Sequence, residues 1–211
     1  MTDETGRSRD LERFITFIDA VTAIAITLLV LPLVDLVPEL GTDGSVTALL
    51  GDHTAELTAF GLSFLVIARL WMSQHRVMST VVVQDALVTR LLLAWTLSIV
   101  VLPFPTALVA QAGHQAATKI FYIGTMAMSS ALLAALAWAG GRNRSIRDTD
   151  QRPDPLPALA SVVGFAIALA ITLAVPSTSY WPLLVMVLCD PFVHWWRGSR
   201  GSQPSHIRMG E

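Results

Sequence analysis

An acidic residue stands inside a stretch that is otherwise almost entirely apolar. The segment 14–33 reads FITFIDAVTAIAITLLVLPL, and its only charged residue is Asp19. An ionisable side chain within a membrane span is costly, so it normally serves a site and has a partner. Ionised aspartate is a hydrogen-bond acceptor, and other parts of the chain must supply its donors.

The stretch ARLWMSQHR at 68–76 offers such donors. It lies at the matching depth if the second apolar segment runs antiparallel to the first. Trp71 and His75 share one helix face, because they are four residues apart. We predict a buried polar cluster of Arg13, Asp19, Trp71 and His75, with Arg69 as a further candidate. Alternatively, Asp19 contacts water at the membrane interface and Arg69 extends towards the lipid head groups.

A helical wheel gives the first apolar segment two different faces. At 100° per residue, Leu28 and Leu31 lie within about 40° of Ile24, and Thr27 within about 60°. Asp19 lies on the opposite side. We name Ile24, Thr27, Leu28 and Leu31 the first-helix stripe. By spacing alone, such a stripe is typical of a packing seam between membrane helices.

The composition is that of an integral membrane protein. Of the 211 residues, 53% are hydrophobic and only 14% are charged, whereas soluble domains carry about 25% charged residues. Backbone groups in hydrocarbon must bond within their own segment, so we expect an all-α fold. Six stretches approach the roughly 20 apolar residues that a spanning helix needs: 14–34, 57–74, 87–110, 118–140, 156–175 and 180–196. Pro103 and Pro105 should kink or end the third helix.

Arginine residues indicate how these helices are oriented. They occur before the first helix, between the second and third, between the fourth and fifth, and after the sixth; the opposite connections contain only Lys119. Six spans place every basic region on one side of the membrane, which the positive-inside rule makes cytoplasmic. We therefore expect a multi-pass protein of the plasma (inner) membrane with both termini in the cytoplasm. Residues 1–197 should form one six-helix domain, and 198–211 a disordered tail.

Three motifs resemble a known family. The pattern R-x-x-x-F-x-D-A-V-x-A-I-A-I-T-L-L-V-L from Arg13 is similar to the first helix of the transmembrane protein 175 family, the endolysosomal potassium channel and its bacterial relatives. WMSQHR at 71–76 and LPFPTAL at 102–108 resemble that family too. The chain has one six-helix repeat, as the bacterial members have. The sequence departs from the family at Ile18, where a serine is usual, and at Pro32, where bacterial relatives often have glutamate.

The resemblance implies a homotetrameric channel in the lipid bilayer, with a central pore lined by the first helix of each subunit. Ile24, Leu28 and Leu31 then correspond to the pore constriction, and Thr27 to a threonine linked to selectivity. The expected function is a potassium-permeable cation channel, with potassium as the permeant ion and with no cofactor, bound metal or nucleic-acid partner. Asp35, at the outer mouth, should concentrate cations.

Two other functions and a question about His75 stay open at this point. A secondary transporter for a small cation or solute usually has an internal repeat with paired helix breaks, but only the third helix carries an evident break. An intramembrane enzyme is disfavoured, because His-x-x-x-His and Gly-x-Ser-x-Gly motifs are absent. His75 either makes gating sensitive to pH or is a structural imidazole bonded to Asp19.

Overall fold

The computed structural model describes residues 2–41, 44–79, 85–113, 115–142 and 156–174. Within these ranges all regular secondary structure is helical. The elements are α1 Thr2–Leu28, α2 Leu31–Val34, the 3₁₀ helix η1 Val37–Leu40, α3 Val46–Asp52, α4 Thr54–Met78, α5 Ala86–Val101, α6 Pro103–Ala112, α7 Ala116–Arg142 and α8 Leu156–Ala174.

Five described segments are long and apolar enough to cross a membrane. They are Leu11–Leu40, Thr54–Met78, Ala86–Val109, Ala116–Arg142 and Leu156–Ala174. The predicted all-α membrane fold is therefore confirmed over this part of the chain. The sixth helix expected at 180–196, the linker at 143–155 and the tail at 198–211 lie outside the described residues.

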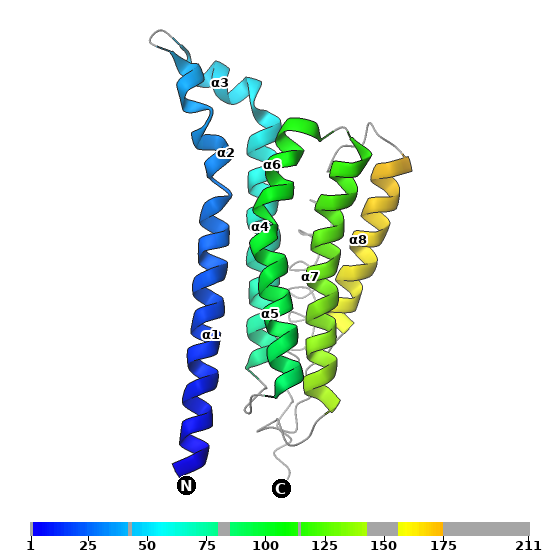
Figure 1. Ribbon diagram of the computed structural model, residues 1–211. Coiled ribbons are helices and arrows are strands. Elements are labelled where there is room, and N and C mark those ends of the chain that lie inside the picture. Colours follow the sequence, from blue (N-terminus) through cyan, green and yellow to red (C-terminus); the bar gives the residue numbers. More distant parts are fainter. Residues whose placement is uncertain (1, 42–43, 80–84, 114, 143–155, 175–211) are drawn as a thin grey trace, which may run out of the picture.

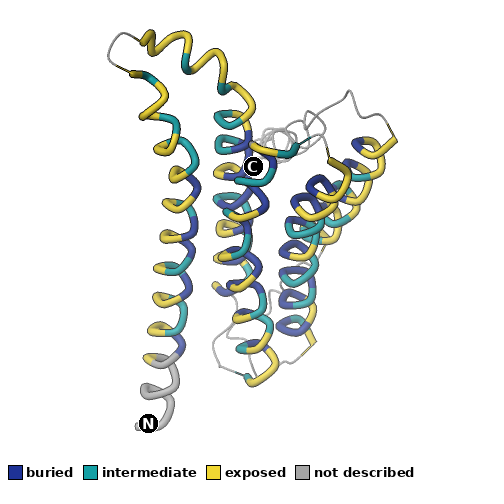
Figure 2. Tube along the Cα trace, turned by 45° about the horizontal axis from the view of Figure 1, so that its top comes forward, coloured by how far each residue is buried: buried dark blue, intermediate teal, exposed yellow. Residues whose placement is uncertain are grey.

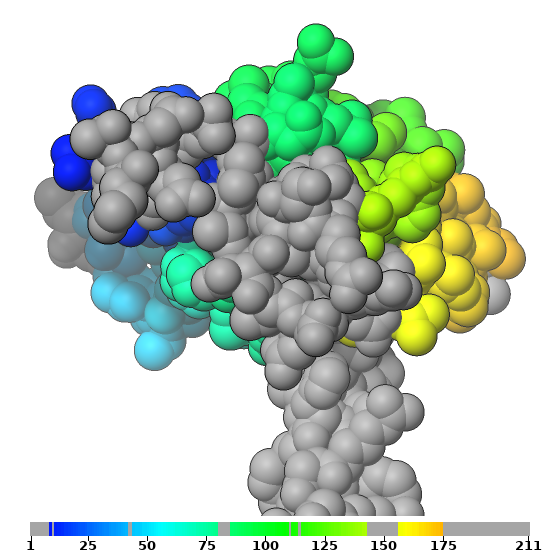
Figure 3. Space-filling model, turned by 90° about the horizontal axis from the view of Figure 1, so that it is seen from below, coloured from blue at the N-terminus to red at the C-terminus, as the bar shows by residue number. Residues whose placement is uncertain are grey.

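The long helices stand side by side in one bundle (Figure 1). α7 packs against α8 and α5, α4 packs against α6 and α7, and α1 contacts α5 and α4 at one edge. Seen from below, α1 and α8 lie on opposite sides of the molecule (Figure 3). We call the end of the bundle that holds the start of α1 the lower end, and the end that holds α3 the upper end.

Aromatic and small residues build the interior of the bundle. Trp95 of α5, Tyr122 of α7 and Phe165 of α8 are the largest of the fully buried side chains. α7 also buries Ser130 and Ala137, small residues that let neighbouring helices approach closely. Lys119 is buried rather than exposed in a connection, and its Nζ donates to the backbone carbonyl of Thr172 in the last turn of α8, at 3.4 Å.

α1 has one face towards the bundle and one face away from it (Figure 2). Ile18, Thr22, Ala25 and Leu29 are buried. These positions are spaced by four, three and four residues, which places them on one side of a helix. The opposite side is exposed along most of α1.

The first span is not the single helix predicted over 14–34. α1 ends at Leu28, and α2 begins at Leu31 with Pro32 in its first turn. Proline lacks the N–H group that would bond to the Leu28 carbonyl. Between the two helices the Val30 N–H donates to the carbonyl of Thr27 at 3.2 Å, a three-residue spacing that marks a 3₁₀ turn. The regular four-residue hydrogen bonding is thus interrupted at the upper end of the first-helix stripe.

The third span breaks at its prolines, as predicted. α5 ends at Val101 and α6 begins at Pro103. The Pro103 ring has no N–H for the Ile99 carbonyl. That carbonyl instead accepts from the Leu102 N–H at 3.2 Å, and the ordinary four-residue spacing resumes when the Thr106 N–H donates to Leu102, also at 3.2 Å.

Candidate functional site

The first-helix stripe lies on the outer face of α1, away from the bundle. Ile24 is 59% exposed, Leu28 39% and Leu31 52%, and Thr27 is exposed between them. Ile24, Thr27, Leu28 and Leu31 are therefore exposed rather than packed against the other described helices. The break before Pro32 places Leu31 on α2 rather than α1, so the stripe runs across two helices.

The Thr27 hydroxyl has a defined hydrogen-bond role within this stripe. It donates to the backbone carbonyl of Ile24 at 2.8 Å. A hydroxyl has only one proton to donate, so the oxygen of Thr27 is left as an acceptor at the exposed surface. Such an oxygen can coordinate a cation but cannot donate a hydrogen bond to an anion.

Asp19 receives a hydrogen bond from Trp71. The indole Nε1–H of Trp71, on α4, donates to Oδ1 of Asp19, on α1, at 2.8 Å. The ring of His75 lies against that of Trp71, with their centroids 5.9 Å apart and their planes 32° from parallel. The acid thus links α1 to α4 near the lower end, on a helix that otherwise stands at the edge of the bundle.

No described contact joins either of the two proposed arginines to Asp19. Arg69 is directed to α8, where its Nη2 donates to the hydroxyl oxygen of Ser161 at 2.8 Å. Arg13 is exposed, and among the described residues its side chain makes no hydrogen bond or ion pair. His75 likewise makes no hydrogen bond with Asp19 there. The structure brings together Asp19, Trp71 and His75, and the four-residue cluster stays a prediction.

A chain of hydroxyl groups that the sequence did not reveal joins three helices. Ser63 of α4 lies 2.8 Å from the Thr106 hydroxyl of α6 and 2.7 Å from the Tyr122 hydroxyl of α7. Thr106 donates its proton to the carbonyl of Leu102 at 2.8 Å. Ser63 must then donate to Thr106, and Tyr122 to Ser63. The only signal in the sequence was the threonine of the LPFPT motif.

The charged residues described between Asp35 and Glu56 are acidic, apart from His53. Asp35, the residue predicted at the outer mouth, follows α2 directly and is exposed. Glu39 lies on η1 and Glu56 in the first turn of α4, and both contact His53, which the sequence analysis did not single out. Among the described residues, no group of three or more His, Cys, Asp or Glu side chains has the geometry to hold a metal ion.

Comparison with known proteins places these features in a family. Residues 13–103 match the family model described as endosomal/lysosomal potassium channel TMEM175. A potassium channel of Streptomyces collinus is 34% identical over 157 residues, which cover 72% of this chain and 73% of that protein. The chain belongs to the TMEM175 family. The family is one of channels, so the chain is not an enzyme.

A solved structure has the same fold. The crystal structure of a lysosomal potassium-selective channel TMEM175 homolog from Chamaesiphon minutus superimposes with a TM-score of 0.72. The match covers 92% of this chain and 100% of that one, at 22% sequence identity. At this identity the likeness concerns the TMEM175 fold alone.

Proposed function

We propose that this TMEM175-family chain forms a homotetrameric potassium-permeable channel whose pore is lined by the first-helix stripe. The observation that carries the proposal is the exposure of Ile24, Leu28 and Leu31 on the side of α1 and α2 that faces away from the bundle. A stripe that the described helices leave exposed can meet the same stripe of other protomers around a shared axis. The potassium channel of Streptomyces collinus, at 34% identity, supports potassium as the permeant ion.

The closed state follows from the chemistry of the stripe. A ring of isoleucine or leucine side chains offers no ligand to an ion that has lost its water, so a narrow apolar ring blocks conduction by dewetting. Ile24 and Leu31 are seven residues apart, about 10 Å of helical rise. The constriction is therefore a short dry section, and a small outward movement or rotation of the lining helices opens it.

Thr27 supplies the selectivity element in this proposal. Its hydroxyl proton is held by the Ile24 carbonyl at 2.8 Å, so four Thr27 oxygens around the axis would present acceptors to a passing ion. These oxygens replace part of the hydration shell and favour potassium, which dehydrates more easily than sodium. Four hydroxyls provide fewer ligands than stacked rings of carbonyls, so the expected selectivity is modest.

We infer that the upper end, with its acidic side chains, faces outside the cell. Arg9, Arg76, Arg90 and Arg142 belong to the regions at the lower end, and an excess of arginine marks the cytoplasmic side. The upper end then faces outward, where Asp35 and its acidic neighbours raise the local cation concentration. Both termini are cytoplasmic in this orientation, and the membrane is the plasma (inner) membrane.

Potassium flux into liposomes that contain the purified protein tests the proposal. Ile24→Asn should raise the basal flux, because an amide side chain hydrates the constriction. The matched control is Ile167→Asn on α8, at a position 54% exposed but across the bundle from α1. Equal effects of the two substitutions, or no flux from well-folded protein, would contradict the pore assignment. Saturable, proton-coupled uptake would instead favour a transporter.

A further inference from the structure

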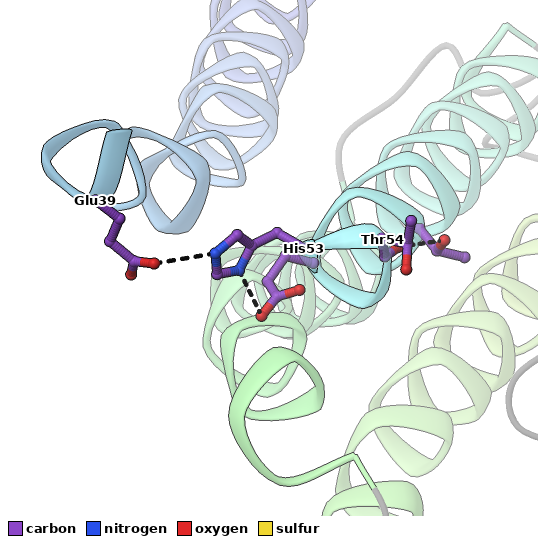
Figure 4. Close-up of polar contacts among 5 residues, drawn as sticks. Glu39, His53 and Thr54 are labelled. Carbon is purple, nitrogen blue, oxygen red and sulfur yellow. Dashed lines mark hydrogen bonds and ion pairs between the residues drawn. The ribbon is translucent and has the colours of Figure 1, made fainter. Parts of the chain in front are cut away.

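A histidine at the upper end lies between two carboxylates that come from different elements. His53 occupies the junction between α3 and α4. Its Nε2 lies 3.0 Å from Oε2 of Glu39, on η1, and its Nδ1 lies 3.4 Å from Oε1 of Glu56, on α4 (Figure 4). Glu39 belongs to the same membrane-spanning segment as the first-helix stripe, Leu11–Leu40. The imidazole thus joins the upper end of that segment to the start of α4.

The geometry fits an imidazole with a proton on each ring nitrogen, because both nitrogens face a carboxylate oxygen. Neutral imidazole has one N–H donor and one bare nitrogen, whereas both nitrogens of the charged form are donors. A neutral His53 would direct a lone pair at one of the two carboxylates. Desolvation opposes the charge on the ring, but the hydrogen bonds to Glu56 and Glu39 outweigh it and raise the pKa of His53 above its ordinary value.

The surrounding charges point in the same direction. The segment from Asp35 to Glu56 contains five acidic residues, and His53 is its only side chain that can become positively charged. The acids on the elements packed around the imidazole are Asp35 at the end of α2, Glu39 on η1, Asp52 on α3 and Glu56 on α4. Protonated His53 is therefore the counter-charge of this part of the molecule.

We propose that His53 is a proton-dependent tie that fixes the upper end of the first membrane segment to α4 through Glu39 and Glu56. The tie is complete when the imidazole is charged. A neutral imidazole keeps an N–H on only one nitrogen and loses the ion pair with both carboxylates. The position of the pore-lining helices then depends on the pH outside the cell; this functional half rests on the proposed pore.

The direction of the pH effect follows from the raised pKa of His53. A group whose pKa is higher in the folded protein stabilises the fold fully below its unfolded pKa, and this contribution is lost as the pH rises through the folded value. The tie therefore holds η1 most firmly at acid pH, below about 6.5, and weakens as the pH rises above the raised pKa.

Nuclear magnetic resonance of the full chain labelled with ¹⁵N-histidine tests the first step. The His53 signals are assigned by their loss in His53→Gln. We expect the pKa of His53 to shift downward in Glu39→Gln and in Glu56→Gln. Asp52→Asn is the matched control, since it removes an adjacent charge that makes no hydrogen bond to the ring among the described residues; its shift should be smaller.

Hydrogen exchange of peptides from residues 31–41 tests the tie itself. The ratio of the rates in His53→Gln and in the unmodified chain cancels the intrinsic pH dependence of exchange. We expect a ratio above one at pH 6 that falls towards one at pH 8.5. A His53 titration insensitive to Glu39, or a ratio of one at both pH values, would overturn the proposal. If the protein passes no potassium, the proposed channel is contradicted. The His53 titration and the hydrogen-exchange ratio then still test whether His53 ties η1 to α4.

Discussion

Asp19 is placed where its charge has a partner but leaves the outer face of α1 apolar. The Trp71 indole donates to it at 2.8 Å, while Ile24 and Leu28 lie on the exposed side of the same helix. A carboxylate in a largely apolar setting is stabilised mainly by such charge-assisted hydrogen bonds. The acid thereby attaches an edge helix to α4 without placing a charge on the stripe.

Replacing Trp71 should reveal the strength of this attachment. Trp71→Phe leaves the Asp19 carboxylate without its donor, and because this hydrogen bond is partly exposed the loss should be about 0.5–1.5 kcal/mol of stability. Asp19→Asn retains an acceptor oxygen and should cost less. Thermal unfolding of the purified protein in detergent measures both, and equal losses in the two variants would show that the hydrogen bond contributes little.

The hydroxyl chain can be tested with the removal of a single oxygen atom. Tyr122→Phe deletes the first donor of the chain to Ser63 and creates no large cavity. Hydrogen bonds between membrane helices are worth about 0.6 kcal/mol on average and up to about 1.7, so a loss in this range is expected. Thr125→Val is the control, because the Thr125 hydroxyl bonds only to its own helix, at the Phe121 carbonyl. An equal loss of stability in both variants would contradict the view that the hydroxyl chain joins the three helices.

At the scale of elements, the sequence predicted which residues share a helix face better than it predicted where helices end and which residues of different helices meet. The helical step of 100° per residue is a local property that puts Ile24 and Leu28 about 40° apart, so the two faces of α1 could be derived without tertiary information. The prolines marked the break between α5 and α6, because a missing N–H is also local. The contacts of Ser63 with Tyr122 and of His53 with Glu39 depend on how distant segments pack. The spacing of residues along one segment does not reveal such contacts. The end of α1 at Leu28 was missed although Pro32 carried the signal.

Pro32 should be the cause of that early end. In Pro32→Ala the new N–H at position 32 can donate to the Leu28 carbonyl and let α1 continue into α2. Amide hydrogen exchange at residue 32 should then show protection typical of a helix. Exchange as fast as in an unstructured peptide would mean that the break has another origin, such as the packing of α2 against α4.

At the scale of the whole molecule, the proposed pore needs several copies of the chain. The described helices form a single bundle with the first-helix stripe on its rim, so a central pathway requires several copies around an axis. We expect four. Native mass spectrometry from detergent should give the mass of four 22.8 kDa chains; a stable monomer or dimer would contradict the tetramer while leaving the fold unaffected.

The most direct measurement is metal block of a cysteine ring. In a Cys189→Ser background, Ile24→Cys should place four thiols around the axis, where thiolates bind a soft divalent ion such as Cd²⁺. Potassium current should then be blocked by Cd²⁺ and recover when a chelator is added, whereas Ile167→Cys on α8 should be insensitive. A current through Ile24→Cys that is as insensitive to Cd²⁺ as the current through Ile167→Cys would contradict a pore lined by the first helix.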